Sequence, residues 1–279
     1  MIPMGWHGHL ELHYRRQGAR TIALDRHDGP LRVLQRLYPE GEGICHHVLV
    51  HPPGGIVGGD TLAVDVRQDP GTHAVITTPS ATRFYRSAGP VAVQQVRAHV
   101  AQDARLEWLP LESIAYNACQ ARNELHFDLA PGAQMLGWDM LALGLPAAGL
   151  AFEQGCVTQH VEWPGVWLER GHLDARDTLL LDSPVGLAGQ RVMGTVWLAT
   201  GSAWPAAQRA ELLELTRTHI AASPLAARVG VTSPNERLIV CRSLAPMVEP
   251  VFALWQSIRA LWRQQAWGLA PVAPRIWAM

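Results

Sequence analysis

The segment His51-Pro52-Pro53-Gly54-Gly55-Ile56-Val57-Gly58-Gly59-Asp60 joins two strand-like runs, Ile44 to Val50 before it and Leu62 to Arg67 after it. The second run alternates apolar and polar residues with the period of two that is typical of a half-buried strand. The two prolines stiffen the entry to the loop, and the two Gly-Gly pairs allow positive φ or a close approach of the backbone. We therefore predict a tight, partly buried loop between two strands rather than a flexible linker.

The glycines of this loop raise the question of phosphate binding. Gly54 and Gly59 have the spacing of a phosphate-binding loop, but Asp60 stands where that motif requires lysine. An acidic side chain at this position repels phosphate, and the dinucleotide-binding pattern G-x-G-x-x-G is absent as well. The 23 basic residues of the chain are all arginine, which also excludes Schiff-base chemistry on lysine. Nucleotide binding by the loop is therefore not expected.

Short strand-like runs continue on both sides of the loop, from residue 8 to about residue 200. Leu10, Leu12 and Tyr14 alternate with polar neighbours, and the same alternation recurs further along the chain. Turn signals such as Asp69-Pro70-Gly71 separate the runs. A period of two with frequent turns predicts a mainly β protein of stacked antiparallel sheets, solenoid-like or sandwich-like in arrangement.

The last 80 residues change character. They and the run before them contain three strand-like segments and two amphipathic helical segments, in the order 190–199, 205–220, 228–232, 237–242 and 251–262. This order predicts a compact β-α-β-β-α end piece with two helices. We expect one structural unit over residues 1–279, made of a β-rich body (1–200) and an α/β C-terminal portion (201–279) packed on it.

Composition limits the class of protein. The formal net charge of −1 and the lack of charge runs argue against nucleic acid or an anionic membrane as a partner. The N-terminal residues lack the apolar core of a signal peptide, and no apolar stretch is long enough to span a bilayer. The four cysteines follow neither a disulfide framework nor a zinc motif. These features predict a soluble, cytoplasmic protein with reduced thiols.

No catalytic constellation is visible, because the motifs H-E-x-x-H and G-x-S-x-G are both absent. Two groups of histidines lie on or beside strand-like runs: His46, His47 and His51, and His7, His9 and His13. In the first group, adjacent histidines point to opposite faces of a strand, so we interpret them as structural. The second group keeps one parity, an arrangement that suits a weak transition-metal site. We predict no tightly bound metal ion in either group.

Three carboxylates lie in apolar surroundings or at the root of the loop: Asp60, Asp139 and Glu169. Around Asp139, both the odd-numbered and the even-numbered positions of residues 135–143 are apolar. A strand with two apolar faces is normally buried on both, so we expect Asp139 to lie inside. A buried carboxylate must be hydrogen-bonded, paired or hydrated, because burying it alone is costly. Glu169 poses the same problem, and its neighbour Arg170 is expected to point the other way. The structural explanation is that each acid pairs with an arginine or caps backbone amides.

Five blocks of the sequence, in order, resemble the urease accessory protein family UreD, called UreH in some organisms. The blocks are His51 to Asp60, Thr77 to Ser87, Leu106 to Pro110, Gly137 to Asp139 with Leu143-Gly144, and Pro274 to Trp277. They extend over nearly the whole chain. Three positions depart from the family pattern: Arg83 replaces a frequent lysine, Leu111 a usual glutamine, and Ala118 an expected glycine in the turn at 115–121.

The resemblance implies a mainly β fold with few helices and a part in installing nickel in apo-urease. An internal path for the ion has been proposed in this family, and Asp60, Asp139 and Glu169 fall on matching motif positions. Carboxylates and water hold a hydrated divalent ion loosely, which suits transit. The resemblance also implies apo-urease, UreF and, through UreF, the GTPase UreG as partners in a hetero-oligomer. Nickel would then be cargo in transit, and no cofactor would be bound permanently.

Two tryptophans of the second helical segment, Trp255 and Trp262, share one face and are candidates for a partner surface or for packing. The leading hypothesis is a non-enzymatic assembly scaffold for urease. The alternative is a stand-alone hydrolase or metalloenzyme that uses the glycine-rich loop, Asp60 and nearby histidines. The missing nucleophile–base spacing counts against this alternative.

Overall fold

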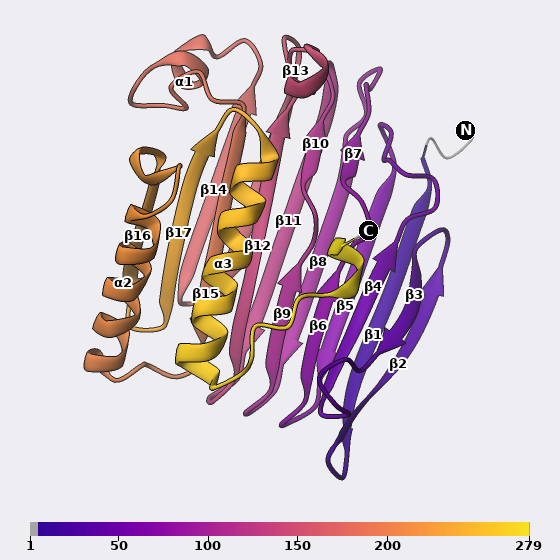
Figure 1. The fold of residues 1–279 in the computed structure, drawn as a ribbon. Coiled ribbons are helices and arrows are strands. Elements are labelled where there is room, and N and C mark those ends of the chain that lie inside the picture. Colours follow the sequence, from indigo (N-terminus) through magenta and orange to yellow (C-terminus); the bar gives the residue numbers. More distant parts are fainter. Residues whose placement is uncertain (1–4, 279) are drawn as a thin grey trace.

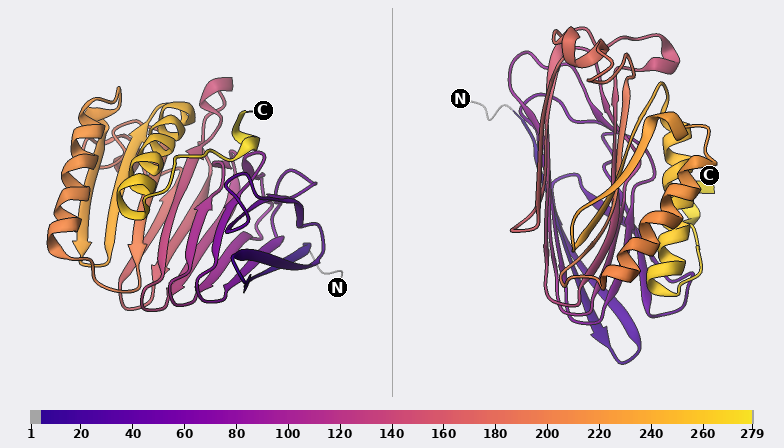
Figure 2. Two further views of the ribbon diagram at one scale, coloured as in Figure 1. Left: turned by 60° about the horizontal axis from the view of Figure 1, so that its bottom comes forward. Right: turned by 90° about the vertical axis from the view of Figure 1, so that its left-hand side faces the viewer.

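Two β-sheets stack face to face, and helices cover the outer face of one of them (Figures 1 and 2). The structure is a computed structural model that describes residues 5–278. Sheet A contains β1 (His7–Gln17), β2 (Arg20–Asp28), β5 (Thr61–Gln68), β8 (Ala92–Val100), β11 (Cys119–Leu129), β13 (Gly155–Trp163) and β14 (Trp167–Asp174). Its strand order is β14-β13-β11-β8-β5-β1-β2.

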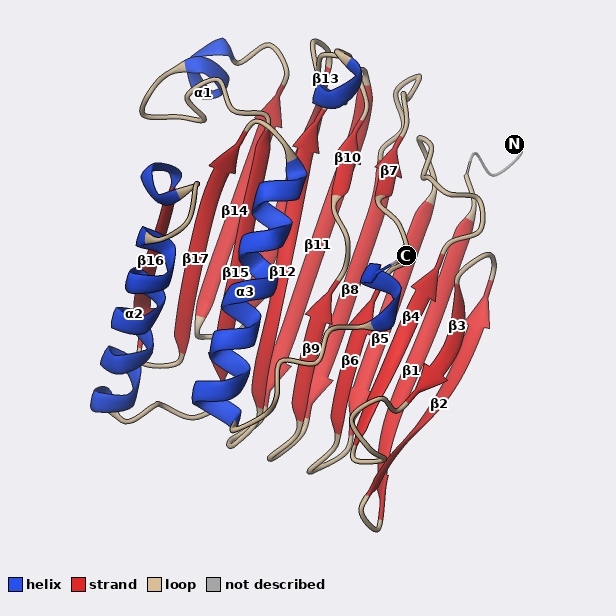
Figure 3. Ribbon diagram, in the orientation of Figure 1, coloured by secondary structure: helices blue, strands red, loops and turns tan. Residues whose placement is uncertain are grey.

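Sheet B has the order β16-β17-β15-β12-β9-β6-β4-β3, with two short strands, β7 and β10, attached beside β12. Its strands are β3 (Arg32–Leu37), β4 (Ile44–Val50), β6 (His73–Thr77), β7 (Thr82–Phe84), β9 (Arg105–Leu109), β10 (Ser113–Ala115), β12 (Gln134–Leu143), β15 (Val192–Thr200), β16 (Val229–Asn235) and β17 (Leu238–Ala245). The α-helices are α1 (Thr178–Asp182), α2 (Ala206–Ala221) and α3 (Val248–Trp267). Three 3-10 turns complete the assignment: Pro146–Ala148, Ala226–Arg228 and Arg275–Ala278. Figure 3 shows how strongly strands dominate.

The central strands are parallel within each sheet. From β4 to β13 the long strands alternate between the sheets, so β5, β8, β11 and β13 are parallel neighbours in sheet A, and β4, β6, β9 and β12 are parallel neighbours in sheet B. The prediction of a mainly β, solenoid-like stack is confirmed, but antiparallel pairing is wrong for these strands. Each turn carries the chain to the other sheet, so the next strand in the same sheet runs in the original direction. Antiparallel pairs occur toward the ends of the sheets, as in β1–β2 and β13–β14.

Two cores lie on the two sides of sheet B. The strand β12 shows the division: Met135 and Leu141 pack into the core between the sheets, whereas Leu136 and Trp138 pack into the core under the helices. Sheet A buries only its inner face, and its outer face carries charged and polar side chains. The sequence is therefore apolar on both parities in β12 and alternating in β11, as strand burial requires.

The C-terminal region has the predicted order, β15-α2-β16-β17-α3, and its three strands extend sheet B in antiparallel fashion. Helix α3 packs on this sheet through a buried stripe that includes Trp255 and Trp262, both with no exposed surface. These tryptophans therefore serve packing in this structure. Helix α3 ends at Gly268, where φ is +64° and the backbone N–H donates to the carbonyls of the last turn.

A network of buried charges joins α3 to sheet B. The Nε of Arg259 donates to Glu107 at 2.7 Å, and the Nε2 of His73 donates to the other carboxylate oxygen at 2.9 Å. Arg263 lies 3.3 Å from Glu107 and also pairs with Glu40. Burial acts to raise the pKa of Glu107, but the charge of Arg259, the hydrogen bond from His73 and the charge of Arg263 together lower that pKa to about 2. Glu107 is therefore ionised in the folded protein.

Two further predictions can be compared with the described part of the chain. All four cysteines are free, as expected. None of the helices within residues 5–278 combines the length and the apolar character that a bilayer crossing demands.

Candidate functional site

The glycine-rich loop between β4 and β5 is tight and anchored, as predicted. In each glycine pair, one residue has a positive φ (Gly54 at +77°, Gly59 at +96°) and the other is closely approached by a neighbouring segment (Gly55, Gly58). A Cβ on Gly58 would lie 2.6 Å from the backbone oxygen of Pro90, closer than real Cβ contacts come. Larger residues are therefore excluded at both pairs, for two different reasons.

Ile56 fixes the loop to a second family-like block of the sequence. Its side chain is fully buried, and its N–H donates to the carbonyl of Arg83 at 2.7 Å. The N–H of Tyr85 donates in return to the carbonyl of Ile56 at 2.9 Å. The blocks at 51–60 and 77–87 therefore form one folded unit rather than two separate motifs.

Asp60 closes the loop by accepting backbone hydrogen bonds. One carboxylate oxygen accepts from the N–H of Trp6 at 2.7 Å, and the other accepts from the N–H of Val57 at 3.1 Å. With both oxygens engaged, Asp60 braces the loop, and this is the contact that the structural explanation expects. It also weakens the alternative in which Asp60 acts as a catalytic group.

A small cavity of about 70 Å³ lies beside the loop, between the two sheets. His51 and Gly54 line it from the loop, Gln94 from β8 and Trp108 from β9. Burial lowers the pKa of His51, although the nearby charge of Asp60 opposes the shift. His51 therefore favours its neutral form at this cavity.

A row of polar side chains runs through the interior from this cavity. Gln94 donates to the side-chain oxygen of Asn123 at 3.3 Å, and Asn123 donates to Asp139 at 3.2 Å. Gln159 donates to the other oxygen of Asp139 at 2.7 Å. We call these four residues the interior polar row. Asp139 comes from β12 in sheet B, and the three amides come from the parallel strands β8, β11 and β13 of sheet A.

Asp139 is partly buried and faces the space between the sheets, as predicted, but among the described residues it neither pairs with an arginine nor caps backbone amides. Within residues 5–278, neither an arginine nor a histidine forms an ion pair with it; its polar contacts are the two neutral amides. Burial raises the pKa of Asp139 to about 6; the hydrogen bonds from Gln159 and Asn123 oppose this rise, and the charge of Glu169 adds to it. The carboxyl group therefore titrates close to neutral pH.

Glu169 is paired. Its carboxylate, on β14 of sheet A, accepts from Arg242 on β17 of sheet B. The same guanidinium lies 5.5 Å from the ring centroid of Trp167. Arg170 points the other way, as expected, and donates to His160 at 3.2 Å. Asp60 and Glu169 thus have the contacts of structural residues, whereas Asp139 does not.

His46 and His47 also point to opposite faces of β4. The Nε2 of His46 donates to Glu40 at 2.8 Å, on the helix side of sheet B. The Nδ1 of His47 shares a hydrogen bond of 2.7 Å with the hydroxyl of Tyr14, in the core between the sheets. Burial lowers the pKa of His47 to about 4, so this ring is neutral. Both contacts fit the structural interpretation.

The histidines of β1 lie on the outer face of sheet A, where each of two is paired with a separate acid. His9 contacts Asp65 at 2.7 Å, and His13 contacts Asp69 at 2.8 Å. The shared face agrees with the prediction from alternating side chains, but the two histidines contact different acids and do not form one cluster.

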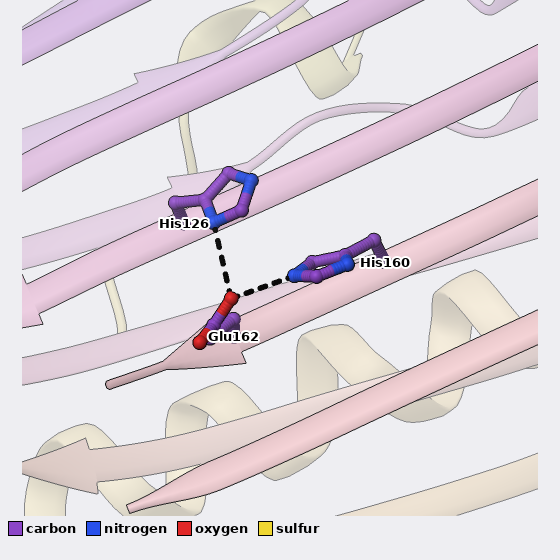
Figure 4. A group of neighbouring side chains, drawn as sticks. All are labelled: His126, His160 and Glu162. Atoms are coloured by element: carbon purple, nitrogen blue, oxygen red, sulfur yellow. Dashed lines mark hydrogen bonds and ion pairs between the residues drawn. The ribbon is translucent and has the colours of Figure 1, made fainter. Parts of the chain in front are cut away.

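A different group gathers three possible metal ligands on this outer face: His126, His160 and Glu162 (Figure 4). It is the one group in residues 5–278 in which three or more histidine, cysteine or acidic ligand atoms lie within 4.8 Å of one another. This group was not predicted from the sequence, because β11 and β13 become neighbours only through the parallel stacking of coils. The sequence did show that all three residues alternate with the apolar, inward-facing residues of their strands, so that they share the outer face.

The turn before β11 contains the alanine that departs from the family pattern. Ala118 has a φ of +62°, a left-handed conformation that glycine adopts without steric cost. Its N–H donates to Gln154 at 2.8 Å, and its carbonyl accepts from Ser87 at 3.0 Å. The turn therefore keeps the backbone geometry of a glycine position although the side chain has changed.

Fold and site together define a class of protein: a solenoid-like β scaffold with helices on one sheet and a polar row through its interior. The chain belongs to the UreD family, because the family model described as "UreD urease accessory protein" matches residues 7–278. The urease accessory protein UreD of Leptothrix cholodnii is 62% identical over 276 residues, covering 98% of this chain and 99% of that protein.

Two further relatives agree. The UreD proteins of Paracidovorax citrulli and Albidiferax ferrireducens are 54% and 55% identical, each over 99% of this chain and 100% of the relative. The earlier resemblance is therefore confirmed over the full length of the match. A chain of this family is a urease accessory protein, with a role in urease maturation.

Proposed function

We propose that this chain is a non-enzymatic scaffold that holds apo-urease while nickel is inserted, with UreF as a direct partner and the GTPase UreG recruited through UreF. The family assignment and the names of the relatives support a role as a urease accessory protein. GTP hydrolysis would belong to UreG, because Asp60 occupies the lysine position of the phosphate-loop outline in this chain. Nickel is cargo in this proposal, not a resident cofactor.

We further propose that nickel crosses the interior along the polar row, and the observation that carries this is the state of Asp139. This carboxyl is held only by neutral amides, so its charge is available to a passing cation. Amide oxygens and water complete a set of oxygen ligands, which bind a divalent ion weakly enough to release it. Glu169 lies within electrostatic reach of Asp139. In this proposal, Glu169 is a second path carboxylate, and Asp60 holds the loop beside the cavity.

Asp139→Asn tests the path. The substitution keeps size and shape, and the amide of Gln159 can rotate to accept a hydrogen bond from the new side chain. Because burial raises the pKa of Asp139 from 3.8 to about 6, its ionisation lowers the stability of the fold as the pH rises from 3.8 to about 6. This loss is complete at neutral pH, so an uncharged Asn is not expected to destabilise the fold there. A loss of nickel delivery can then be separated from a loss of folding.

The experiment uses cells that carry the urease genes but lack the gene for this chain, complemented with wild type or variant. Three quantities are measured: the urease proteins recovered with this chain, the nickel content of urease, and its activity. We expect Asp139→Asn to keep complex recovery and to lower nickel content and activity together. Asp128→Asn, on the exposed face of β11 beside His99, is the matched control and should behave as wild type.

Two results would count against the proposal, each against a different part. Normal nickel content with Asp139→Asn would reject the interior path and leave the scaffold role standing. Failure of wild-type protein to recover urease or its accessory proteins, with urease fully active in the deletion strain, would reject the scaffold role itself.

A further inference from the structure

We propose that His126, His160 and Glu162 form a binding site for a divalent first-row transition-metal ion on the outer face of sheet A. The site is independent of the interior path, although it uses the same two strands. Asn123 and Gln159 point from β11 and β13 into the core, whereas His126 and His160 point outward.

Strand register brings the three ligands together. His126 is directly paired with Glu162 across the parallel strands β11 and β13, and His160 precedes Glu162 by two residues on the same face. One carboxylate oxygen of Glu162 lies 3.5 Å from the Nδ1 of His126 and 2.8 Å from the Nε2 of His160. Ligand atoms that share one ion at about 2.0–2.2 Å are themselves separated by roughly 3.0–3.5 Å. These spacings therefore fit one ion after small side-chain rotations.

The types of donor atom suit metal binding. Two imidazoles and one carboxylate form a donor set that first-row ions such as zinc and nickel accept, with the remaining positions open to water.

Arg170 competes with the ion for His160. Its Nε donates to the Nδ1 of His160 at 3.2 Å, so in this arrangement the proton of the ring lies on Nε2, the atom that faces Glu162. A metal ion at Nε2 requires the proton on Nδ1, where it would oppose the N–H of Arg170. Arg170 must therefore turn away when an ion binds, and its exposed position permits this. If the three residues formed only an ion-pair cluster, Arg170 would not compete with a ligand for His160.

A shallow groove of about 530 Å³ leads to the site along the outer face of sheet A. His126 lines it, together with Asp128 of the same strand, Arg97 and His99 of β8, and Glu11 and Asp65 further along. The groove opens the site to a hydrated ion at His126, the one of the three ligands that lines it. It also brings the charge of Arg97 toward His126, which opposes the ion as Arg170 does.

The test is calorimetric titration of tag-free, full-length protein with Zn²⁺ and, separately, Ni²⁺ at pH 7.5. We expect wild type to bind one ion that is lost or weakened by roughly tenfold or more in His126→Gln and in His160→Gln. Arg170→Gln, which removes the competing guanidinium, is expected to tighten binding. His99→Gln removes an exposed histidine that has a single acid partner, Asp128, and should bind as wild type does.

Asp139→Asn separates this site from the interior, because it should leave the same equivalent of bound ion. Thermal melting without metal checks that the surface substitutions fold normally. The proposal is overturned if wild type binds neither ion, if His126→Gln binds as tightly as wild type, or if His99→Gln loses as much affinity as His126→Gln. A drop in affinity with Arg170→Gln would equally contradict the assigned role of that arginine.

Discussion

Replacing Glu107 with Gln should weaken the attachment of helix α3 to sheet B more than any single surface change. Glu107 has no exposed surface and accepts hydrogen bonds from Arg259 and His73. Glutamine keeps the shape but removes the charge and turns one acceptor into a donor. The one remaining oxygen can accept from Arg259 or from His73 but not from both, and the buried guanidinium of Arg259, itself 2% exposed, loses the carboxylate that balances its charge.

The magnitude follows from the pKa. The pKa of Glu107 falls from a usual 4.5 to about 2 in the folded protein, although burial alone acts in the opposite direction. Because one pKa unit corresponds to about 1.4 kcal/mol, ionised Glu107 contributes about 3 kcal/mol at pH 7. Breaking a buried ion pair by removing one partner typically costs about 3–5 kcal/mol, which agrees. We therefore expect the free energy of unfolding to fall by about 3 kcal/mol.

The pH dependence has a definite sign. A carboxyl whose pKa is lowered by folding contributes its full stability above its unfolded pKa and loses it as the pH falls toward the folded value. The difference between wild type and Glu107→Gln should therefore be constant above pH 4.5 and should shrink between pH 4.5 and pH 2. Urea unfolding followed by tryptophan fluorescence, repeated from pH 7 down to pH 3, measures this difference.

Glu214→Gln is the matched control, because Glu214 pairs with Arg217 on the exposed surface of α2. Such a pair contributes between about 0 and 1 kcal/mol, so this variant should be close to wild type. Adding Arg259→Met to Glu107→Gln removes the stranded charge and should recover part of the loss. A change of less than 1 kcal/mol at pH 7 for Glu107→Gln, or a difference that persists unchanged at pH 3, would refute the reasoning.

Two other substitutions probe the backbone. Ala118→Gly should stabilise the protein by about 1 kcal/mol, because glycine adopts the left-handed φ of +62° without strain; an unchanged or lower melting temperature would contradict this. Gly58→Ala should destabilise it by about 1–3 kcal/mol, since the added Cβ meets the backbone of Pro90. Gly171→Ala, whose Cβ would have no neighbour within 4 Å, should have little effect, and equal melting temperatures for the two alanine variants would refute the close-contact argument.

The sequence predicted burial better than it predicted strand direction. Alternation in Leu62, Val64 and Val66 reports which face of a strand is buried, and all three lie in the core between the sheets. The same pattern arises whether the neighbouring strand runs parallel or antiparallel, so it carried no information on direction. The connections decide direction, and a turn that crosses to the other sheet looks in sequence like a turn within one sheet.

The same limit applies to the candidate site. The interior position of Asp139 and the outward direction of Arg170 follow from parity, and both were predicted correctly. The pairing of Glu169 with Arg242 was not predictable, because it joins two sheets across distant segments of the chain. The metal-ligand group on β11 and β13 was missed for the same reason, since residues in different coils become neighbours only through the stacking.

The use of both faces of β11 and β13 has a consequence for the lengths that these strands tolerate. Deleting one residue within β11 would reverse the direction of every side chain on one side of the deletion, because successive side chains point to opposite faces. Depending on where the deletion falls, Asn123 would leave the interior polar row, or the imidazole of His126 would enter the core, or both. The turn after β11 is different, because Pro131 and Gly132 are exposed and do not alternate between a buried and an exposed face. Variation in chain length among related proteins should therefore concentrate in the turns, while the strand between residues 119 and 129 keeps its length.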